Sequence, residues 1–169
     1  MPSKPRLSGM TLIEIMVVMA IVLVLAGLLL PNYQQFLGKA DQVICTGKLR
    51  NLYLNFSTQL KDGNGWPQLP SSVIVGSIQE QKWWVDYASN TMGLTLRDWQ
   101  CPSFIRFSSR STNTDKSDII SYLPTLFDSS PTTPLNNMRM PWFTESGNFH
   151  HVGNLSIRAD GSVSAAQQY

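Results

Sequence analysis

Residues 10–30 form an almost uninterrupted apolar run, and this run limits what the chain can fold into. Glu14 is its single ionisable side chain, and none lies between Ile15 and Leu30. As a helix, these 21 residues span roughly 31 Å, close to the thickness of the hydrocarbon core of a bilayer. We therefore expect a membrane-spanning helix that is apolar on all faces.

The basic side chains around the run predict its orientation. Lys4 and Arg6 precede it, and the next basic residue is Lys39. The positive-inside bias then places the N-terminus in the cytoplasm and the rest of the chain outside. The chain has 13 basic and 11 acidic side chains, so the numbers are equal once Lys4 and Arg6 are set aside. Such a balance does not indicate a nucleic-acid partner.

A secretory signal peptide and a plain signal anchor are the alternatives for this segment. A signal peptide has an apolar core of about 7–15 residues and a cleavage site of small residues. Here the run is longer, and the sequence PNYQQF follows it from Pro31. A plain anchor has no use for Glu14, because a carboxylate in a membrane helix costs on the order of 3 kcal/mol unless it is paired or reaches the interface.

Residues 8–14, SGMTLIE, resemble the prepilin leader of type IV pilins and type II secretion pseudopilins. In that family a membrane peptidase cuts after the glycine, here Gly9, and N-methylates the new first residue, here Met10. Pilins usually have Phe at that position. The glutamate that the family has at the fifth position of the mature chain corresponds to Glu14, and Pro31 falls where many pilins have a helix-kinking proline.

The resemblance implies an α+β fold in which a long N-terminal helix packs on a small, mostly antiparallel sheet. It divides the chain into four expected parts. These are a cytoplasmic leader (1–9), a transmembrane and filament-core helix (10–30), an amphipathic continuation of that helix (31–61) and a periplasmic globular domain (62–169).

The resemblance further implies a structural subunit of a type II secretion-like pseudopilus or a type IV pilus-like filament. Its partners are then copies of itself, other pseudopilins, the prepilin peptidase and methyltransferase, an inner-membrane assembly platform and membrane lipid. The subunit waits in the bacterial inner membrane and then joins a filament in the periplasm or at the cell surface. The alternative is a monomeric periplasmic binding protein anchored in the inner membrane.

Glu14 has a physical role in this interpretation. Cleavage leaves an amine on Met10 near the membrane face, and Glu14 of one subunit can pair with the Met10 amine of a neighbour. The two charges then neutralise each other only in the assembled state, which fixes the register of the subunits.

Apolar residues at steps of three and four predict that the helix continues past Pro31 to about Lys61. The predicted stripe consists of Phe36, Ala40, Val43, Ile44, Gly47, Leu52, Phe56 and Leu60. Pro31 lacks a backbone donor and is expected to kink the helix without ending it. The segment 62–65, DGNG, is a strong stop signal.

The remaining sequence predicts short elements. We expect a helix or strand at 79–87, an extended segment at 104–107, a surface loop at 108–117, a strand at 119–123 and a loop at 128–137. Residues 154–159 and 162–164 alternate around Asp160-Gly161, which predicts a hairpin with a type I′ turn. Most of the five tryptophans are expected to pack the domain against the helix.

Two groups of residues are candidates for covalent or metal chemistry. Cys45 and Cys101 form either a disulfide, contributing on the order of 4 kcal/mol, or two buried free thiols. The spacing from His150 to Asp160-Gly161 resembles the C-terminal His-x(nine)-Asp-Gly motif of a pseudopilin-like subgroup. His150, His151 and Asp160 either bind a metal or serve the hairpin structurally.

No cofactor is expected, although some major pseudopilins hold calcium in a C-terminal loop. The loop acids that offer carboxylates here, without the spacing of a calcium loop, are Asp115, Asp118 and Asp128. None of the sequence motifs of nucleophilic, zinc-dependent or nucleotide-dependent enzymes is present, so we do not expect an enzyme.

Overall fold

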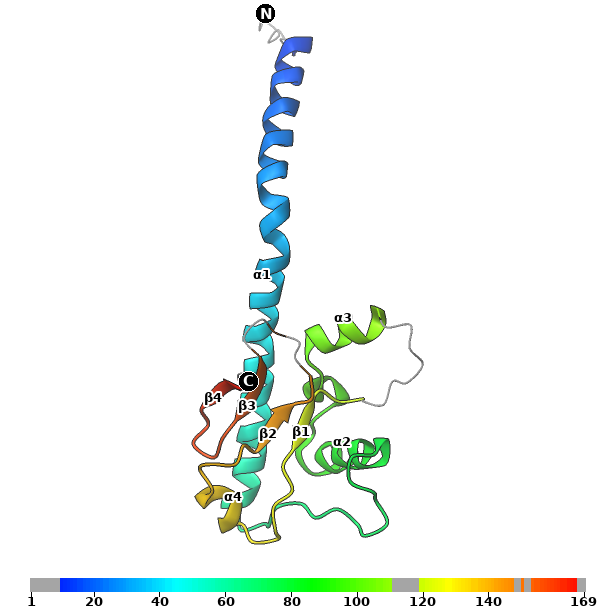
Figure 1. Ribbon diagram of the computed structural model, residues 1–169, viewed down its shortest axis with the longest axis vertical. Coiled ribbons are helices and arrows are strands. Elements are labelled where there is room, and N and C mark those ends of the chain that lie inside the picture. The colour runs from blue at the N-terminus through cyan, green and yellow to red at the C-terminus, as the bar shows by residue number, and fades with distance from the viewer. Residues whose placement is uncertain (1–9, 111–118, 148–149, 151–152, 167–169) are drawn as a thin grey trace, which may run out of the picture. The chain divides into compact units, whose positions relative to one another are not determined.

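The computed structural model describes residues 10–110, 119–147, 150 and 153–166, without the side chains of 29–32, 34, 35, 107–110 and 166. The chain forms two compact units, which divide between Leu37 and Gly38 and are described separately. Its elements are shown in Figure 1: α1 (Leu12–Lys61), α2 (Ile78–Met92), the 3-10 helix η1 (Leu96–Trp99), α3 (Pro102–Arg110), β1 (Tyr122–Pro124), α4 (Thr132–Asn136), β2 (Phe143–Glu145), β3 (Asn154–Ile157) and β4 (Val163–Ala166).

Helix α1 ends where the sequence predicted. The amide of Asn64 donates to the carbonyl of Gln59 at 3.2 Å, and the amide of Gly63 donates to that of Leu60 at 3.2 Å. Together these two bonds form a Schellman motif, which requires a left-handed residue at the helix end. Gly63 supplies it with a φ of 83°. Pro31 lies within α1, and its expected kink stays a prediction.

The face of α1 that packs on the domain differs from the predicted stripe. The buried apolar side chains on this face are Cys45, Leu49, Leu52, Phe56 and Leu60. The predicted stripe was therefore correct only from Leu52 onward, because Val43 is 72% exposed and Ile44 is 48% exposed. Both helix faces carry apolar residues before Leu52, so periodicity alone selected the wrong one.

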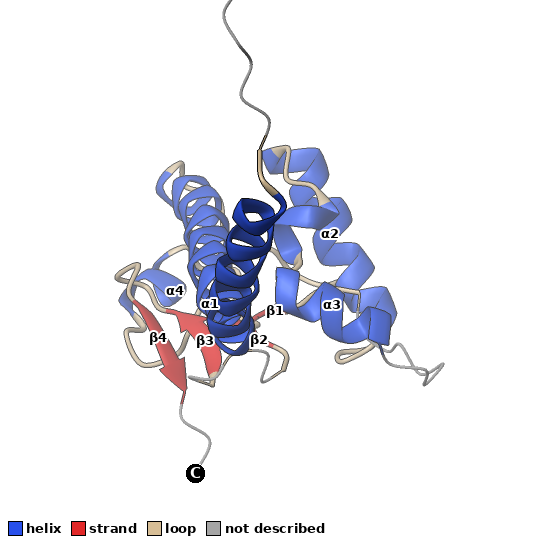
Figure 2. Ribbon diagram, turned by 90° about the horizontal axis from the view of Figure 1, so that it is seen from above, coloured by secondary structure: helices blue, strands red, loops and turns tan. Residues whose placement is uncertain are grey.

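The second unit has the predicted α+β architecture. Its four strands form one antiparallel sheet in the order β1-β2-β3-β4. Helices α2 and α3 lie beside the β1 edge, as Figures 1 and 2 both show. The sequence did not predict β2, which occupies the centre of the sheet by pairing Phe143 with Ile157 and Thr144 with Leu123.

The C-terminal hairpin is present, but its turn is not of type I′. Strands β3 and β4 pair from Asn154↔Ala166 to Ile157↔Val163, so the connection is longer than two residues. The amide of Gly161 donates to the carbonyl of Arg158 at 2.9 Å, and Gly161 has a φ of 75°. No non-glycine residue in the described chain has a positive φ, whereas type I′ needs two successive positive values. The bonds are those of a three-residue loop with a glycine bulge.

Residues 104–107 were predicted to be extended, and this was wrong, because they belong to α3. Pro102 is the first residue of this helix, a position where its fixed φ suits the helix and its missing N–H is not needed. Residues 108–110 also belong to α3 and not to the predicted loop, whose remaining part to 117 lies outside the described residues.

Two further elements refine the prediction. The segment 79–87 is helical, within α2, which Ser77 caps by accepting a hydrogen bond from the Glu80 amide at 3.2 Å. The predicted loop at 128–137 contains the short helix α4. Pro134 is compatible with this helix, because it lies in the first turn, where the backbone N–H that proline lacks has no partner within the helix. Asp128 accepts from the Thr133 hydroxyl at 3.0 Å and supports the start of this helix.

The predicted strand at 119–123 begins later, at Tyr122. The amides of Ile119 and Ile120 donate instead to the side-chain oxygen of Gln81, at 2.7 and 3.2 Å. A side chain from α2 thus takes the place of a neighbouring strand before β1 begins.

An aromatic core joins α1 to the rest of the second unit. The Phe56 ring lies 5.3 Å from that of Trp66 and 5.0 Å from that of Phe143, between ring centroids. Four tryptophans are fully buried in this unit, namely Trp66, Trp84, Trp99 and Trp142. The prediction that most tryptophans pack the domain against the helix is confirmed.

Candidate functional site

The described side chains of residues 10–28 are all exposed in the first unit. Over this stretch α1 is apolar on every face, which is typical of a helix that is covered by lipid or by other helices. Over the part of the chain that the structure describes, no helix has both the length and the apolarity that crossing a membrane requires.

Glu14 and Thr11 form a reciprocal cap at the start of α1. The Glu14 carboxylate accepts from the Thr11 amide at 2.8 Å and from the Thr11 hydroxyl at 2.9 Å. The Glu14 amide in turn faces the Thr11 hydroxyl at 3.4 Å. The sequence Thr-Leu-Ile-Glu is thus a capping box, which satisfies backbone donors that every helix leaves free at its first turn. This local partner of Glu14 was not predicted from the sequence.

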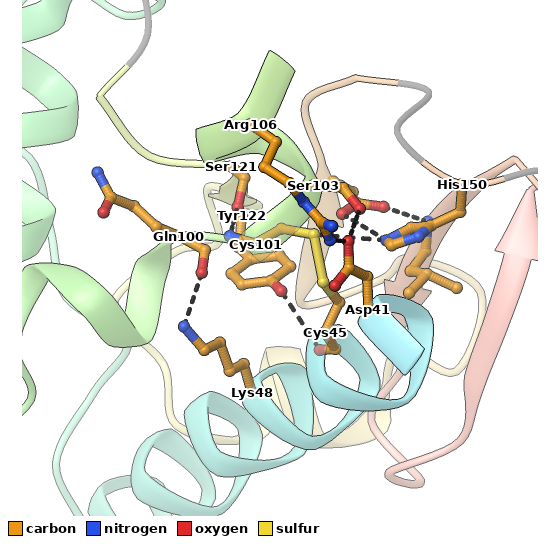
Figure 3. The surroundings of a disulfide bond; sticks show 12 residues. Asp41, Cys45, Lys48, Gln100, Cys101, Ser103, Arg106, Ser121, Tyr122 and His150 are labelled. Carbon is orange, nitrogen blue, oxygen red and sulfur yellow. Dashed lines mark hydrogen bonds and ion pairs between the residues drawn. A yellow bond between two sulfur atoms is a disulfide. The ribbon is translucent and has the colours of Figure 1, made fainter. Parts of the chain in front are cut away.

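Cys45 and Cys101 form a disulfide, with their Cα atoms 5.4 Å apart. This resolves the two alternatives left open by the sequence. The bond ties α1 to the residue that precedes α3, and both cysteines are fully buried (Figure 3). A chemical cross-link therefore reinforces the junction of the helix with the domain.

A buried histidine and a buried carboxylate lie against this disulfide. His150 Nε2 is 3.5 Å from Cys101 Sγ and 3.2 Å from Glu145 Oε1. Glu145 comes from β2 and also accepts from the Leu155 amide at 3.2 Å. The side chains of His150 and Glu145 are 1% and 0% exposed. Glu145 was not predicted as a site residue, because no sequence motif includes it.

An ion pair near the disulfide joins α1 to α3. Asp41 of α1 accepts from the Ser103 hydroxyl at 2.6 Å and pairs with the guanidinium of Arg106 (Figure 3). Asp41 is largely buried, whereas the Arg106 side chain is 42% exposed. The disulfide and the contacts of Asp41 with Ser103 and Arg106 thus both fasten α3 to α1.

Lys48 and Tyr122 both donate to backbone carbonyls near the disulfide, the Tyr122 hydroxyl to that of Cys45 at 3.4 Å. The Lys48 ammonium donates to the carbonyls of Arg97 at 2.5 Å and Gln100 at 2.8 Å. Partial burial lowers the pKa of Lys48, and the nearby Asp98 carboxylate opposes this change. Burial, with a smaller contribution from Glu145, raises the pKa of Tyr122, so its phenol stays protonated.

The residues of the C-terminal motif have separate environments. His150 is buried in the cysteine cluster, whereas Asp160 is exposed and accepts from the Ser162 amide at 2.8 Å. Gly161 lies against Tyr53 of α1, where an added Cβ would be 3.2 Å from the ring. In the described residues, these features support a structural role for the Asp-Gly turn.

The predicted metal candidates are not brought together. Among the described residues, the group of potential ligands close enough to hold one ion consists of Cys45, Cys101, Glu145 and His150, and it does not include Asp160 or Asp128. His151, and the calcium candidates Asp115 and Asp118, lie outside the described residues.

Comparison with known proteins adds one finding to this geometry. Residues 5–30 match the family model described as the prokaryotic N-terminal methylation motif. No curated protein and no solved structure matches the chain. The match supports a type IV pilin-like precursor, a class of structural subunits and not of enzymes. The α+β fold, with its N-terminal helix and four-stranded antiparallel sheet, is consistent with that class.

Proposed function

We propose that this chain is the precursor of a structural subunit of a type II secretion-like pseudopilus or a type IV pilus-like filament. The observation that carries the proposal is the methylation motif at residues 5–30, with Glu14 at the start of the apolar first part of α1. A prepilin peptidase cuts between Gly9 and Met10 and methylates the new amine.

Before assembly, residues 10–30 lie in the inner membrane, with the N-terminus in the cytoplasm and the domain in the periplasm. The disulfide of the second unit agrees with an exported domain, because such bonds persist in oxidising compartments. An inner-membrane platform then transfers the subunit from lipid into the filament. Lipid supplies no hydrophobic driving force between helices, so packing and polar contacts must favour assembly.

Glu14 supplies the polar contact by pairing with the Met10 amine of the neighbouring subunit. The capping box modifies how this pair forms. Thr11 holds the Glu14 carboxylate at the first turn of its own helix, which reduces the side-chain entropy that pairing would otherwise cost. A carboxylate has about four acceptor positions, so it can serve the cap and the neighbouring amine together.

Two variants separate the charge of Glu14 from its capping role. Glu14→Gln keeps an acceptor for the capping box, since Gln is also found at this position of the motif, but it removes the negative charge. Thr11→Ala removes the hydroxyl of the cap and keeps the charge. Each full-length variant is co-expressed with a prepilin peptidase and an assembly platform, and sedimentable filament is measured against total subunit.

We expect Glu14→Gln to abolish filament and Thr11→Ala to retain most of it. Membrane fractionation provides the control that both variants reach the membrane. The proposal fails if Glu14→Gln assembles as well as the natural chain. The alternative, a monomeric membrane-anchored binding protein, predicts instead that the natural chain also forms no filament.

The C-terminal hairpin favours a secretion pseudopilus over a surface pilus. The spacing from His150 to Asp160-Gly161 resembles that of a pseudopilin-like subgroup, and other pseudopilins are then its neighbours in the filament. In this proposal the two ends of the motif stabilise the fold: His150 beside the disulfide and Gly161 against Tyr53.

A further inference from the structure

The buried group around the disulfide contains four side chains of the types that bind zinc. Cys45, Cys101, Glu145 and His150 each present a ligand atom, and these atoms all lie within 4.8 Å of one another. They come from α1, the residue before α3, β2 and the segment before β3, so segments far apart in the sequence meet at this point. All four residues are buried, which excludes the ordinary explanation of an acidic surface cluster.

Two of the distances between these atoms match the edges of a tetrahedral zinc site. Typical bond lengths of about 2.3 Å for Zn–S and about 2.0–2.1 Å for Zn–N and Zn–O give tetrahedral edges of about 3.6 Å for N···S and about 3.3 Å for N···O. His150 Nε2 is 3.5 Å from Cys101 Sγ and 3.2 Å from Glu145 Oε1. Two of the edges are therefore already formed while the disulfide is closed.

We propose that the reduced chain binds one zinc ion through Cys45, Cys101, Glu145 and His150. The disulfide and the metal are then alternative cross-links of the same helix junction. This inference does not depend on the proposed filament function.

The chemistry balances with a thiol or phosphine reductant. The reductant supplies two electrons to the disulfide, and two protons from solvent complete the two thiols. Zinc displaces both thiol protons and binds two thiolates. In the bound state His150 carries its imidazole proton on Nδ1, which leaves Nε2, now 3.2 Å from Glu145 Oε1, free to bind the metal. Nδ1 has no hydrogen-bond partner among the described residues, so it is open to take up this proton.

The surroundings also hold the ligands in place. The Leu155 amide donates to the second oxygen of Glu145 at 3.2 Å, as an outer-shell donor does for a ligating carboxylate. The two sulfurs have to separate to about 3.8 Å, the tetrahedral S···S edge, when the bond opens. Their Cα atoms are 5.4 Å apart, so rotation of the two side chains can supply part of this separation without moving the backbone.

The test uses the full-length chain in detergent, with Co²⁺ and then Zn²⁺ as probes, under anaerobic conditions with a phosphine reductant. We expect one Co²⁺ per reduced chain, with the thiolate charge-transfer and tetrahedral ligand-field absorption of a site with two sulfurs. Zn²⁺ should displace it. The oxidised chain should bind neither ion, and the reduced chain unfolded in guanidinium should lose the tetrahedral spectrum.

Variants identify the other two ligands. His150→Gln and Glu145→Gln should each weaken binding by at least tenfold, whereas Asp160→Asn, which changes an exposed acid outside the cluster, should not. Circular dichroism of the oxidised variants shows whether they fold. The proposal is overturned if the reduced natural chain gives no tetrahedral cobalt spectrum. It is equally overturned if folded His150→Gln and Glu145→Gln bind the ion as tightly as the natural chain.

Discussion

Two leucines of α1 provide a matched test of how the helix packs on the domain. Leu49 is 0% exposed and lies on the buried face, whereas Leu54, five residues later, is 59% exposed. Leu→Ala at a buried site costs about 3–5 kcal/mol, because the lost transfer free energy adds to the cavity left behind. At an exposed site the change usually stays within about 0.5 kcal/mol.

The free energy of unfolding can be followed by tryptophan fluorescence, since four tryptophans are buried in this unit. With the disulfide intact, we expect Leu49→Ala to lower the melting temperature of the domain by about 10–20 °C. Leu54→Ala should leave it nearly unchanged. The assigned packing face is wrong if the two variants are equally destabilised, or if Leu54→Ala is the more severe.

The remaining predictions concern the disulfide and the C-terminal turn. Reducing the disulfide in the presence of a metal chelator should lower the free energy of unfolding by about 4 kcal/mol, because the bond closes a loop across 56 positions of sequence separation. Denaturant titration with and without reductant measures this difference. A difference below about 1 kcal/mol contradicts the prediction. The Ser162 hydroxyl and amide lower the pKa of Asp160. This stabilisation is therefore present above the unfolded pKa of about 3.9 and is lost as the pH falls through the lower folded value. In melts at several pH values, the stability advantage of the natural chain over Asp160→Asn should hold above about pH 5 and shrink below about pH 4; an advantage that grows in acid refutes the assigned contact.

The sequence was most informative where one physical signal dominated. The apolar run predicted a helix from its first residues, the DGNG segment predicted where that helix ends, and the alternation around Asp160-Gly161 predicted the hairpin. The errors arose where two signals competed. Cys101-Pro102 was interpreted as the start of an extended segment, but a proline also suits the first turn of a helix.

The buried cluster shows what sequence reasoning lacked. The cysteines and His150 were candidates in separate groups, and Glu145 was not a candidate at all. Cys101 is 56 positions from Cys45 and 49 positions from His150, and such separations predict no contact. The residues are close because of how the segments that carry them pack in the folded domain. The capping box, by contrast, follows directly from the spacing of Thr11 and Glu14, which is that of the motif S/T-x-x-E.

The N-terminal mass of the mature protein tests the central claim most directly. The full chain is isolated from bacterial membranes that contain a prepilin peptidase, and its N-terminal peptide is analysed by tandem mass spectrometry. The proposal predicts a chain that begins at Met10 with one methyl group on its amine. A chain that retains Met1, or one that begins beyond Leu30, contradicts it.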